Sequence, residues 1–161
     1  MLLAQPGPHK VPLFNFLGAK EGAGERGVCF PVRIRVKPPL HILIADDDLD
    51  KRLLLNTVIS RQLRTASIFE CDSGKEALDY FLSNRVDVIV SDHNMFPVDG
   101  IQLVKEIRKW GSNIPFIMVT GHDELKARAE AAGVDLFVST ADTLQIGKVI
   151  ADLLATRGIS A

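Results

Sequence analysis

Short apolar runs alternate with longer, helix-like segments along the chain from residue 40 onward. The runs lie at 41–45, 66–71, 86–91, 114–120 and 136–139, and most of them are rich in valine and isoleucine. Such runs are typical of strands that are buried on both faces of a sheet. The intervening segments predict five helices, at about 48–63, 74–82, 100–110, 123–132 and 142–156.

The signals at the ends of these segments agree with the alternation. Ser73 with Glu76 three residues later forms a capping-box sequence before the second helix. Gly111 and Gly133 are in place to end the third and fourth helices. Five strand–helix units with short links predict an α/β fold, a doubly wound five-stranded parallel sheet with helices on both faces.

Residues 1–38 differ from the rest of the chain, because they are rich in glycine and proline and show no sustained periodicity. We expect them to be a disordered extension or a segment that is not native to the protein. The prolines at 38 and 39 forbid a helix and favour an extended entry. The predicted domain therefore covers residues 39–158.

Composition and charge narrow the class of protein. The hydrophobic fraction of 47% is ordinary for a globular domain, and the net charge of −1 points to neither a nucleic-acid nor a membrane partner. No apolar stretch approaches the roughly 20 residues that cross a bilayer, and prolines interrupt the start of the chain where a secretory signal needs a continuous apolar run. Cys29 and Cys71 lack metal-ligand spacing and suit a reducing cytosol, so we expect a cytoplasmic protein.

Carboxylates follow two of the predicted strands. Asp46 and Asp47 come directly after the first strand, and Asp92 follows the third. With a strand order of 2-1-3-4-5 these strands are neighbours, and the crevice at their carboxyl ends is where open α/β sheets bind ligands. Three converging carboxylates repel one another unless a cation neutralises them, and oxygen ligands suit Mg²⁺. Together with the hydroxyl of Thr120 at the end of the fourth strand, they predict a phosphoryl-transfer site.

These residues lie in motifs that resemble the receiver domains of two-component response regulators, and among these the single-domain chemotaxis (CheY-like) type. The motifs are HILIADDD at 41–48, VIVSDHNM at 88–95 with Asp99-Gly100 after it, and FIMVTG at 116–121. The resemblance covers about residues 40–157 and implies the flavodoxin-like fold with strand order 2-1-3-4-5.

The resemblance also implies roles for residues at matching positions, with Mg²⁺ as the cofactor. These are Asp92 as the phospho-acceptor and metal ligand, Asp47 as a direct metal ligand, Asp46 as an acidic member of the metal site that often acts through water, Asn94 as a ligand through its backbone carbonyl, Thr120 as the switch hydroxyl and Phe137 as the rotating aromatic. In the family the phosphoryl donor is a phosphohistidine on a sensor histidine kinase or a phosphotransfer protein.

Two features depart from the family pattern. Thr140 stands where a lysine is expected to pair with the acceptor aspartate, and Lys148 on the following helix has no evident route to the site. Proline follows Phe96 one residue later than usual and reshapes the loop after Asp92. We expect His93 and His122 beside the crevice to face solvent, because the carboxylates already suffice for a hard cation.

The leading hypothesis is a stand-alone response regulator that catalyses its own phosphorylation and dephosphorylation and signals by protein–protein contact through the face formed by residues 123–156. The alternative is a receiver that docks independently of phosphorylation, and Thr140 is the evidence for it. A haloacid-dehalogenase-type phosphatase is a third reading, because Asp46 and Asp48 form a D-x-D after a strand. Asp50 stands where that family needs threonine, and the chain is short for it.

Overall fold

The fold is organised around one parallel sheet. The computed structural model describes residues 39–159, so the predicted extension at 1–38 lies outside the described range. The strands are β1 (His41–Ala45), β2 (Ser67–Cys71), β3 (Val88–Ser91), β4 (Phe116–Thr120) and β5 (Leu136–Ser139). They pair in parallel in the order β2-β1-β3-β4-β5. The predicted fold class and strand order are thereby confirmed.

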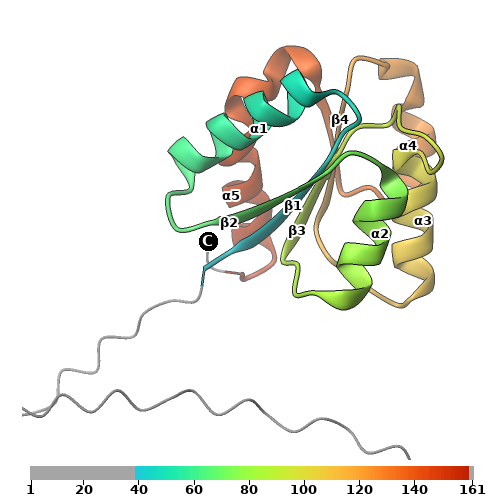
Figure 1. Ribbon diagram of the computed structural model, residues 1–161, viewed down its shortest axis with the longest axis horizontal. Coiled ribbons are helices and arrows are strands. Elements are labelled where there is room, and N and C mark those ends of the chain that lie inside the picture. The colour runs from blue at the N-terminus through green and yellow to red at the C-terminus, as the bar shows by residue number, and fades with distance from the viewer. Residues whose placement is uncertain (1–38, 160–161) are drawn as a thin grey trace, which may run out of the picture. The chain divides into compact units, whose positions relative to one another are not determined.

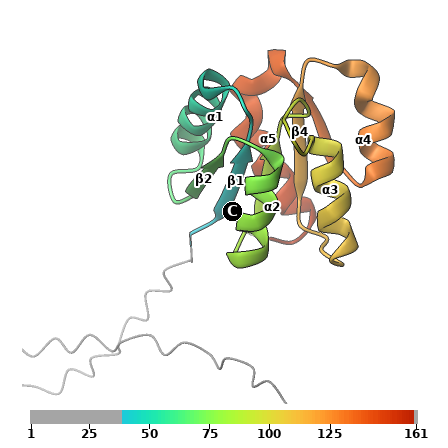
Figure 2. The same cartoon turned by 45° about the vertical axis from the view of Figure 1, so that its right-hand side comes forward.

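Five α-helices cover both faces of this sheet. They are α1 (Leu49–Gln62), α2 (Gly74–Ser83), α3 (Gly100–Lys109), α4 (Lys126–Ala132) and α5 (Ile146–Thr156). Helices α1 and α5 lie together on one face, while α2, α3 and α4 lie on the other (Figures 1 and 2). Across residues 39–159, every helix falls short of the length and apolar character that a membrane-spanning helix requires.

The last two helices begin later than the sequence predicted. The 3₁₀ turns η1 (Asp123–Leu125) and η2 (Thr140–Gln145) precede α4 and α5. In η2 the hydroxyl of Thr143 donates a hydrogen bond to the carbonyl of Thr140 at 2.7 Å, which closes a tight turn before the α-helix starts. Leu144 in this turn is consequently 66% exposed and does not extend the apolar face of α5.

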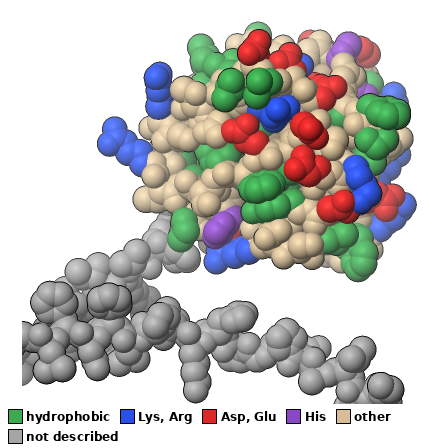
Figure 3. All heavy atoms as spheres, viewed as in Figure 1, with side chains coloured by type: hydrophobic (Ala, Val, Ile, Leu, Met, Phe, Trp, Pro, Cys, Tyr) green, Lys and Arg blue, Asp and Glu red, His purple; other side chains and the backbone are tan. Residues whose placement is uncertain are grey.

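The core has two layers, one on each side of the sheet, because successive strand residues point to opposite faces. On β1, Ile42 and Ile44 pack with residues of α1 and α5, whereas Leu43 and Ala45 pack with residues of α2 and α3. Helix α1 buries Leu55 and other positions of one stripe, and the neighbouring Leu54 is 44% exposed. Acidic, basic and hydrophobic side chains are interspersed over the face seen in Figure 3.

Candidate functional site

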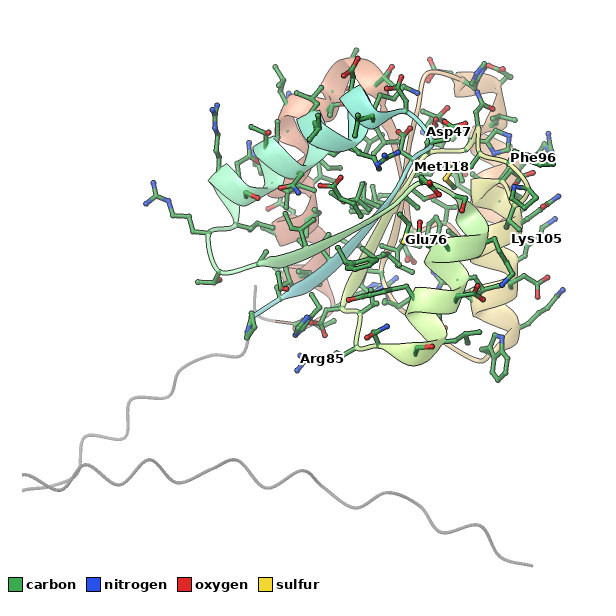
Figure 4. All side chains as sticks on the ribbon, in the orientation of Figure 1. Asp47, Glu76, Arg85, Phe96, Lys105 and Met118 are labelled. Carbon is green, nitrogen blue, oxygen red and sulfur yellow. The ribbon has the colours of Figure 1, made fainter. Side chains whose placement is uncertain are left out.

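The carboxyl ends of β1 and β3 bring three acidic side chains together. Ala45 and Ser91, the last residues of these strands, are partners in the sheet, and the N–H of Asp92 donates to the carbonyl of Ala45 at 2.8 Å. One carboxylate oxygen from each of Asp46, Asp47 and Asp92 lies within 4.8 Å of the other two. Asp47 marks this end of the sheet in Figure 4. The structure thus assembles the acidic cluster that the sequence predicted.

Asp46 is a carboxylate of this cluster whose charged form is disfavoured by its surroundings. Its side chain is buried, and Oδ1 accepts a hydrogen bond from the N–H of Asp48 at 2.9 Å. Burial, helped by the nearby carboxylate of Asp92, raises the pKa of Asp46 from 3.8 to about 6, although the hydrogen bond from Asp48 and the charge of Lys51 oppose the rise. The folded protein therefore holds a proton on Asp46 more tightly than the unfolded chain does.

An Asp46→Asn variant should be more stable than the wild type above about pH 6 in the absence of divalent cations. Folding then no longer requires a buried charge, and the amide oxygen still accepts from Asp48. The pKa difference corresponds to a gain in the free energy of unfolding of up to about 3 kcal/mol, and this gain shrinks as the pH falls toward about 4. Urea unfolding in the presence of a chelator, at about pH 7.5 and about pH 4.5, measures the gain. A gain that is equal at both pH values would contradict this account, and Asp79→Asn at an exposed ion pair is the matched control.

The carboxylate of Asp92 has two partners that hold it in place. Oδ1 accepts a hydrogen bond from the N–H of His93 at 2.7 Å, and Oδ2 lies 3.2 Å from Nζ of Lys51 on the first turn of α1. Burial alone would lower the pKa of Lys51, but the carboxylates of Asp92 and Asp46 outweigh it, so the pKa is raised. Lys51 therefore remains a cation at neutral pH.

Sequence reasoning missed Lys51, although a signal for it was present. The helix that follows the acidic pair at Asp46 and Asp47 begins at Leu49, with Asp48 as its N-cap. The backbone of a lysine on the first turn of such a helix lies close to the carboxylates. Its long side chain can therefore extend back to them. This placement is visible in the sequence once the helix start is known.

The remaining predicted site residues lie around the cluster at different depths. Thr120 ends β4, is buried, and pairs in register with Ser139 of β5. Thr140 follows Ser139 and lines a cavity of about 100 Å³ together with Asp46 and Lys51. Phe137 is half-buried and packs with the cluster on the α2–α4 side of the sheet, away from this cavity. The switch roles of Thr120 and Phe137 remain predictions.

The two histidines near the crevice differ from one another. His122 is about half exposed, as predicted, and its ring bridges Asn94 at 2.9 Å and Glu124 at 3.0 Å. His93 was expected to face solvent, and that expectation is wrong, because its side chain is only 14% exposed. The carbonyl of His93 accepts from the N–H of Gly100 at 3.0 Å, so the loop folds back over the histidine.

The loop from Asp92 to Gly100 is closed by close backbone packing. Asp99 is the N-cap of α3, and its Oδ1 accepts from the N–H of Gln102 at 2.7 Å. A Cβ on Gly100 would lie 2.2 Å from the carbonyl oxygen of Asp92, so this position needs glycine. Between these anchors, the Phe96–Pro97 peptide is cis and Phe96 projects outward (Figure 4).

Comparison with known proteins agrees with this fold. A model of the response regulator receiver domain matches residues 42–141, which is more than half of the chain. The chain belongs to the response regulator receiver domain family. This membership places it in two-component signalling.

Individual receiver proteins show the same relationship. Response regulator MprA from Mycolicibacterium vanbaalenii is 33% identical over 97 residues, which are 60% of this chain and 40% of that protein. The receiver domain of the Francisella response regulator 1452 has a TM-score of 0.67 at 29% identity and covers 74% of this chain and 98% of that one. Response regulator TrrA from Thermotoga maritima, in complex with Mg²⁺-BeF, has a TM-score of 0.63 at 25% identity and covers 71% of this chain and 98% of that one. This receiver chain spans about two fifths of the length of MprA.

Proposed function

We propose that this receiver accepts a phosphoryl group on Asp92 with the help of Mg²⁺ and signals by contact with another protein. The observation that carries the proposal is the acidic cluster itself, with three carboxylates within 4.8 Å of one another around buried Asp92. Such a cluster at the end of a parallel sheet suits a hard cation beside a carboxylate nucleophile.

The donor set fits Mg²⁺. Asp46, Asp47 and Asp92 offer carboxylate oxygens, and the proposal adds the backbone carbonyl of Asn94 as a fourth protein ligand. When bound, Mg²⁺ would neutralise charge on the oxygens of the transferring phosphoryl group. A nearby cation would also stabilise the charged form of Asp46, which burial and the charge of Asp92 disfavour.

The protein's own contribution to the transfer is to position Asp92. A carboxylate oxygen of Asp92 forms the new bond to phosphorus, while the P–N bond of a phosphohistidine donor breaks and the imidazole nitrogen keeps the electron pair. The N–H of His93 fixes the Oδ1 atom of Asp92 at 2.7 Å, which leaves the carboxylate little rotational freedom. Positioning of this kind supplies much of the catalysis in phosphoryl transfer.

The proposed partners follow from the family. The donor would be a sensor histidine kinase or a histidine phosphotransfer protein, and the output would use the face formed by residues 123–156 in the cytoplasm. Thr120 and Phe137 would carry the change from the site to that face. We propose neither a nucleic-acid nor a membrane partner for this receiver domain.

Incubation of the protein with Mg²⁺ and acetyl phosphate tests the proposal. We expect an intact-mass increase of about 80 Da that is absent when a chelator removes Mg²⁺ and is lost on treatment with hydroxylamine, which cleaves acyl phosphates. Peptide mapping should place the adduct on the fragment that contains Asp92. The absence of any adduct, with no change on adding Mg²⁺ and beryllofluoride, would reject phosphoryl acceptance.

A second candidate function rests on Thr140. This residue directly follows β5, at the position where the family pattern has lysine, so the expected cation is missing from that position. A receiver without a working phosphorylation site would serve as a docking module whose binding is constant. The same experiment separates the two functions, because a docking module gives neither an adduct nor a response to beryllofluoride.

A further inference from the structure

Lys51 approaches the acceptor from a helix rather than from strand five. Its Nζ atom lies 3.2 Å from Oδ2 of Asp92, and the two residues are 41 positions apart in the sequence. The pair joins the first turn of α1 to the end of β3, so it is a tertiary contact and not a local helix pair. The carboxylate of Asp92 is almost wholly buried, whereas the side chain of Lys51 is 44% exposed.

The space beside this contact opens toward Thr140. A cavity of about 100 Å³ is lined by Asp46, Lys51 and Thr140, and its walls also include Leu54, Leu55, Val119 and Thr143. Thr140 ends in a short neutral side chain, and its Oγ1 atom lies next to Gly121 at the end of β4. Lys51 and Thr140 therefore border the same cavity. Among the residues that line this cavity, Lys51 alone has a positively charged side chain.

We propose that Lys51 is the cationic catalytic residue of this receiver and performs from α1 the task for which Thr140 is unsuited. The inference rests on the proposed function, since it concerns the same phosphoryl transfer. Before transfer, the ammonium group contacts a carboxylate oxygen of Asp92. As the new P–O bond forms and the donor leaves with the electron pair of the broken bond, Lys51 exchanges this contact for one to a phosphoryl oxygen and gives up no proton.

The competing reading is that Lys51 occupies the place of the metal and blocks it. The geometry favours the catalytic reading, because the side chain of Lys51 borders the Thr140 cavity as well as the acidic cluster. A lysine that only replaced Mg²⁺ would need no access to that cavity. The two interpretations predict different rates when Lys51 is removed at saturating Mg²⁺: the rate falls if Lys51 is catalytic and is unchanged if Lys51 only competes with the metal.

The test compares phosphorylation rates with acetyl phosphate in four proteins, each at its own saturating Mg²⁺ concentration. These are the wild type, Lys51→Met, the double variant Lys51→Met/Thr140→Lys, and Lys109→Met as a matched control. Lys109 also pairs with a carboxylate, Glu106, but at the far end of α3. Thermal unfolding checks that every variant is folded, and calorimetry gives each affinity for Mg²⁺.

We expect Lys51→Met to slow formation of the adduct about ten- to a hundredfold, which is the range for losing a hydrogen bond to a charged group. Lys109→Met should match the wild type. The double variant should recover most of the rate, because a lysine at position 140 extends into the shared cavity. Removal of the positive charge should also strengthen Mg²⁺ binding, and this gain makes no difference at saturation.

Other outcomes overturn the inference in distinguishable ways. An equal rate for Lys51→Met and wild type, with unchanged affinity for Mg²⁺, would show that Lys51 has no role at the site. An equal rate with tighter Mg²⁺ binding by Lys51→Met would show that Lys51 only competes with the metal. Failure of Thr140→Lys to recover any rate in a folded double variant would show that the two positions do not share a task. A wild type without adduct would reject the proposed function, and this inference with it.

Discussion

Substitution of Asp92 with asparagine is expected to abolish the phosphoryl adduct. The amide has nearly the same volume as the carboxylate, and its oxygen still accepts from the N–H of His93, which holds Oδ1 at 2.7 Å in the wild type. It lacks the charge that makes the carboxylate a nucleophile. Intact-mass measurement with Mg²⁺ and acetyl phosphate should show no increase of about 80 Da in the variant under conditions that modify the wild type.

The same substitution should also change the pKa of a neighbouring carboxylate, that of Asp46. Asp92 is one of the charges that raise the pKa of Asp46, so Asp92→Asn should lower that pKa. Asp79→Asn, an identical change at an exposed pair with Lys75, should keep both the adduct and the wild-type stability. Adduct formation by Asp92→Asn at the wild-type rate would place the acceptor at another residue.

The sheet and its acidic cluster could be predicted from the sequence because both follow from local pattern. Buried parallel strands require continuous apolar runs, and the carboxyl ends of neighbouring strands meet at one edge of the sheet. Asp46, Asp47 and Asp92 therefore had to converge once the strand order was right. Their roles in metal binding and phosphoryl transfer remain predictions.

The features that the sequence did not reveal depend on side-chain reach and on loop closure. Lys51 reaches Asp92 because α1 begins directly after the acidic pair, and residue type alone does not show the direction of a long side chain. His93 is mostly buried because the N–H of Gly100 closes the loop onto its carbonyl. The late start of α5 depends on the tight 3₁₀ turn at Thr140, which helical periodicity does not distinguish from a first α-helical turn.

Gly100 connects the fold to the site, because it touches the backbone of the acceptor residue. Its N–H donates to the carbonyl of His93, and the Asp92 carbonyl oxygen occupies the position next to its Cα where a Cβ would lie. That carbonyl also accepts a hydrogen bond from the hydroxyl of Ser91 at 2.8 Å. A displacement of Gly100 from the carbonyl of Asp92 would therefore move the start of α3 away from the end of β3.

Replacement of Gly100 by alanine should produce the largest loss of stability among the substitutions considered. The added Cβ would lie 2.2 Å from the carbonyl oxygen of Asp92, a backbone atom that can move only together with its strand or loop. Overpacking of this kind costs about 3 kcal/mol, which urea unfolding measures. Because the shift also moves the carboxylate of Asp92, we expect slower adduct formation even where the variant is fully folded.

The matched control for this substitution is Gly111→Ala at the end of α3. Gly111 has a φ of 74°, and a Cβ there would meet nothing within 4 Å, so alanine brings backbone strain without a clash. Gly111→Ala should lower the free energy of unfolding by about 1 kcal/mol. Adduct formation should be unchanged. Equal losses of stability in the two variants would show that the Gly100 position relaxes easily. The proximity of Gly100 to the Asp92 carbonyl would then be no constraint, and the glycine of the Asp99-Gly100 pair would need another explanation.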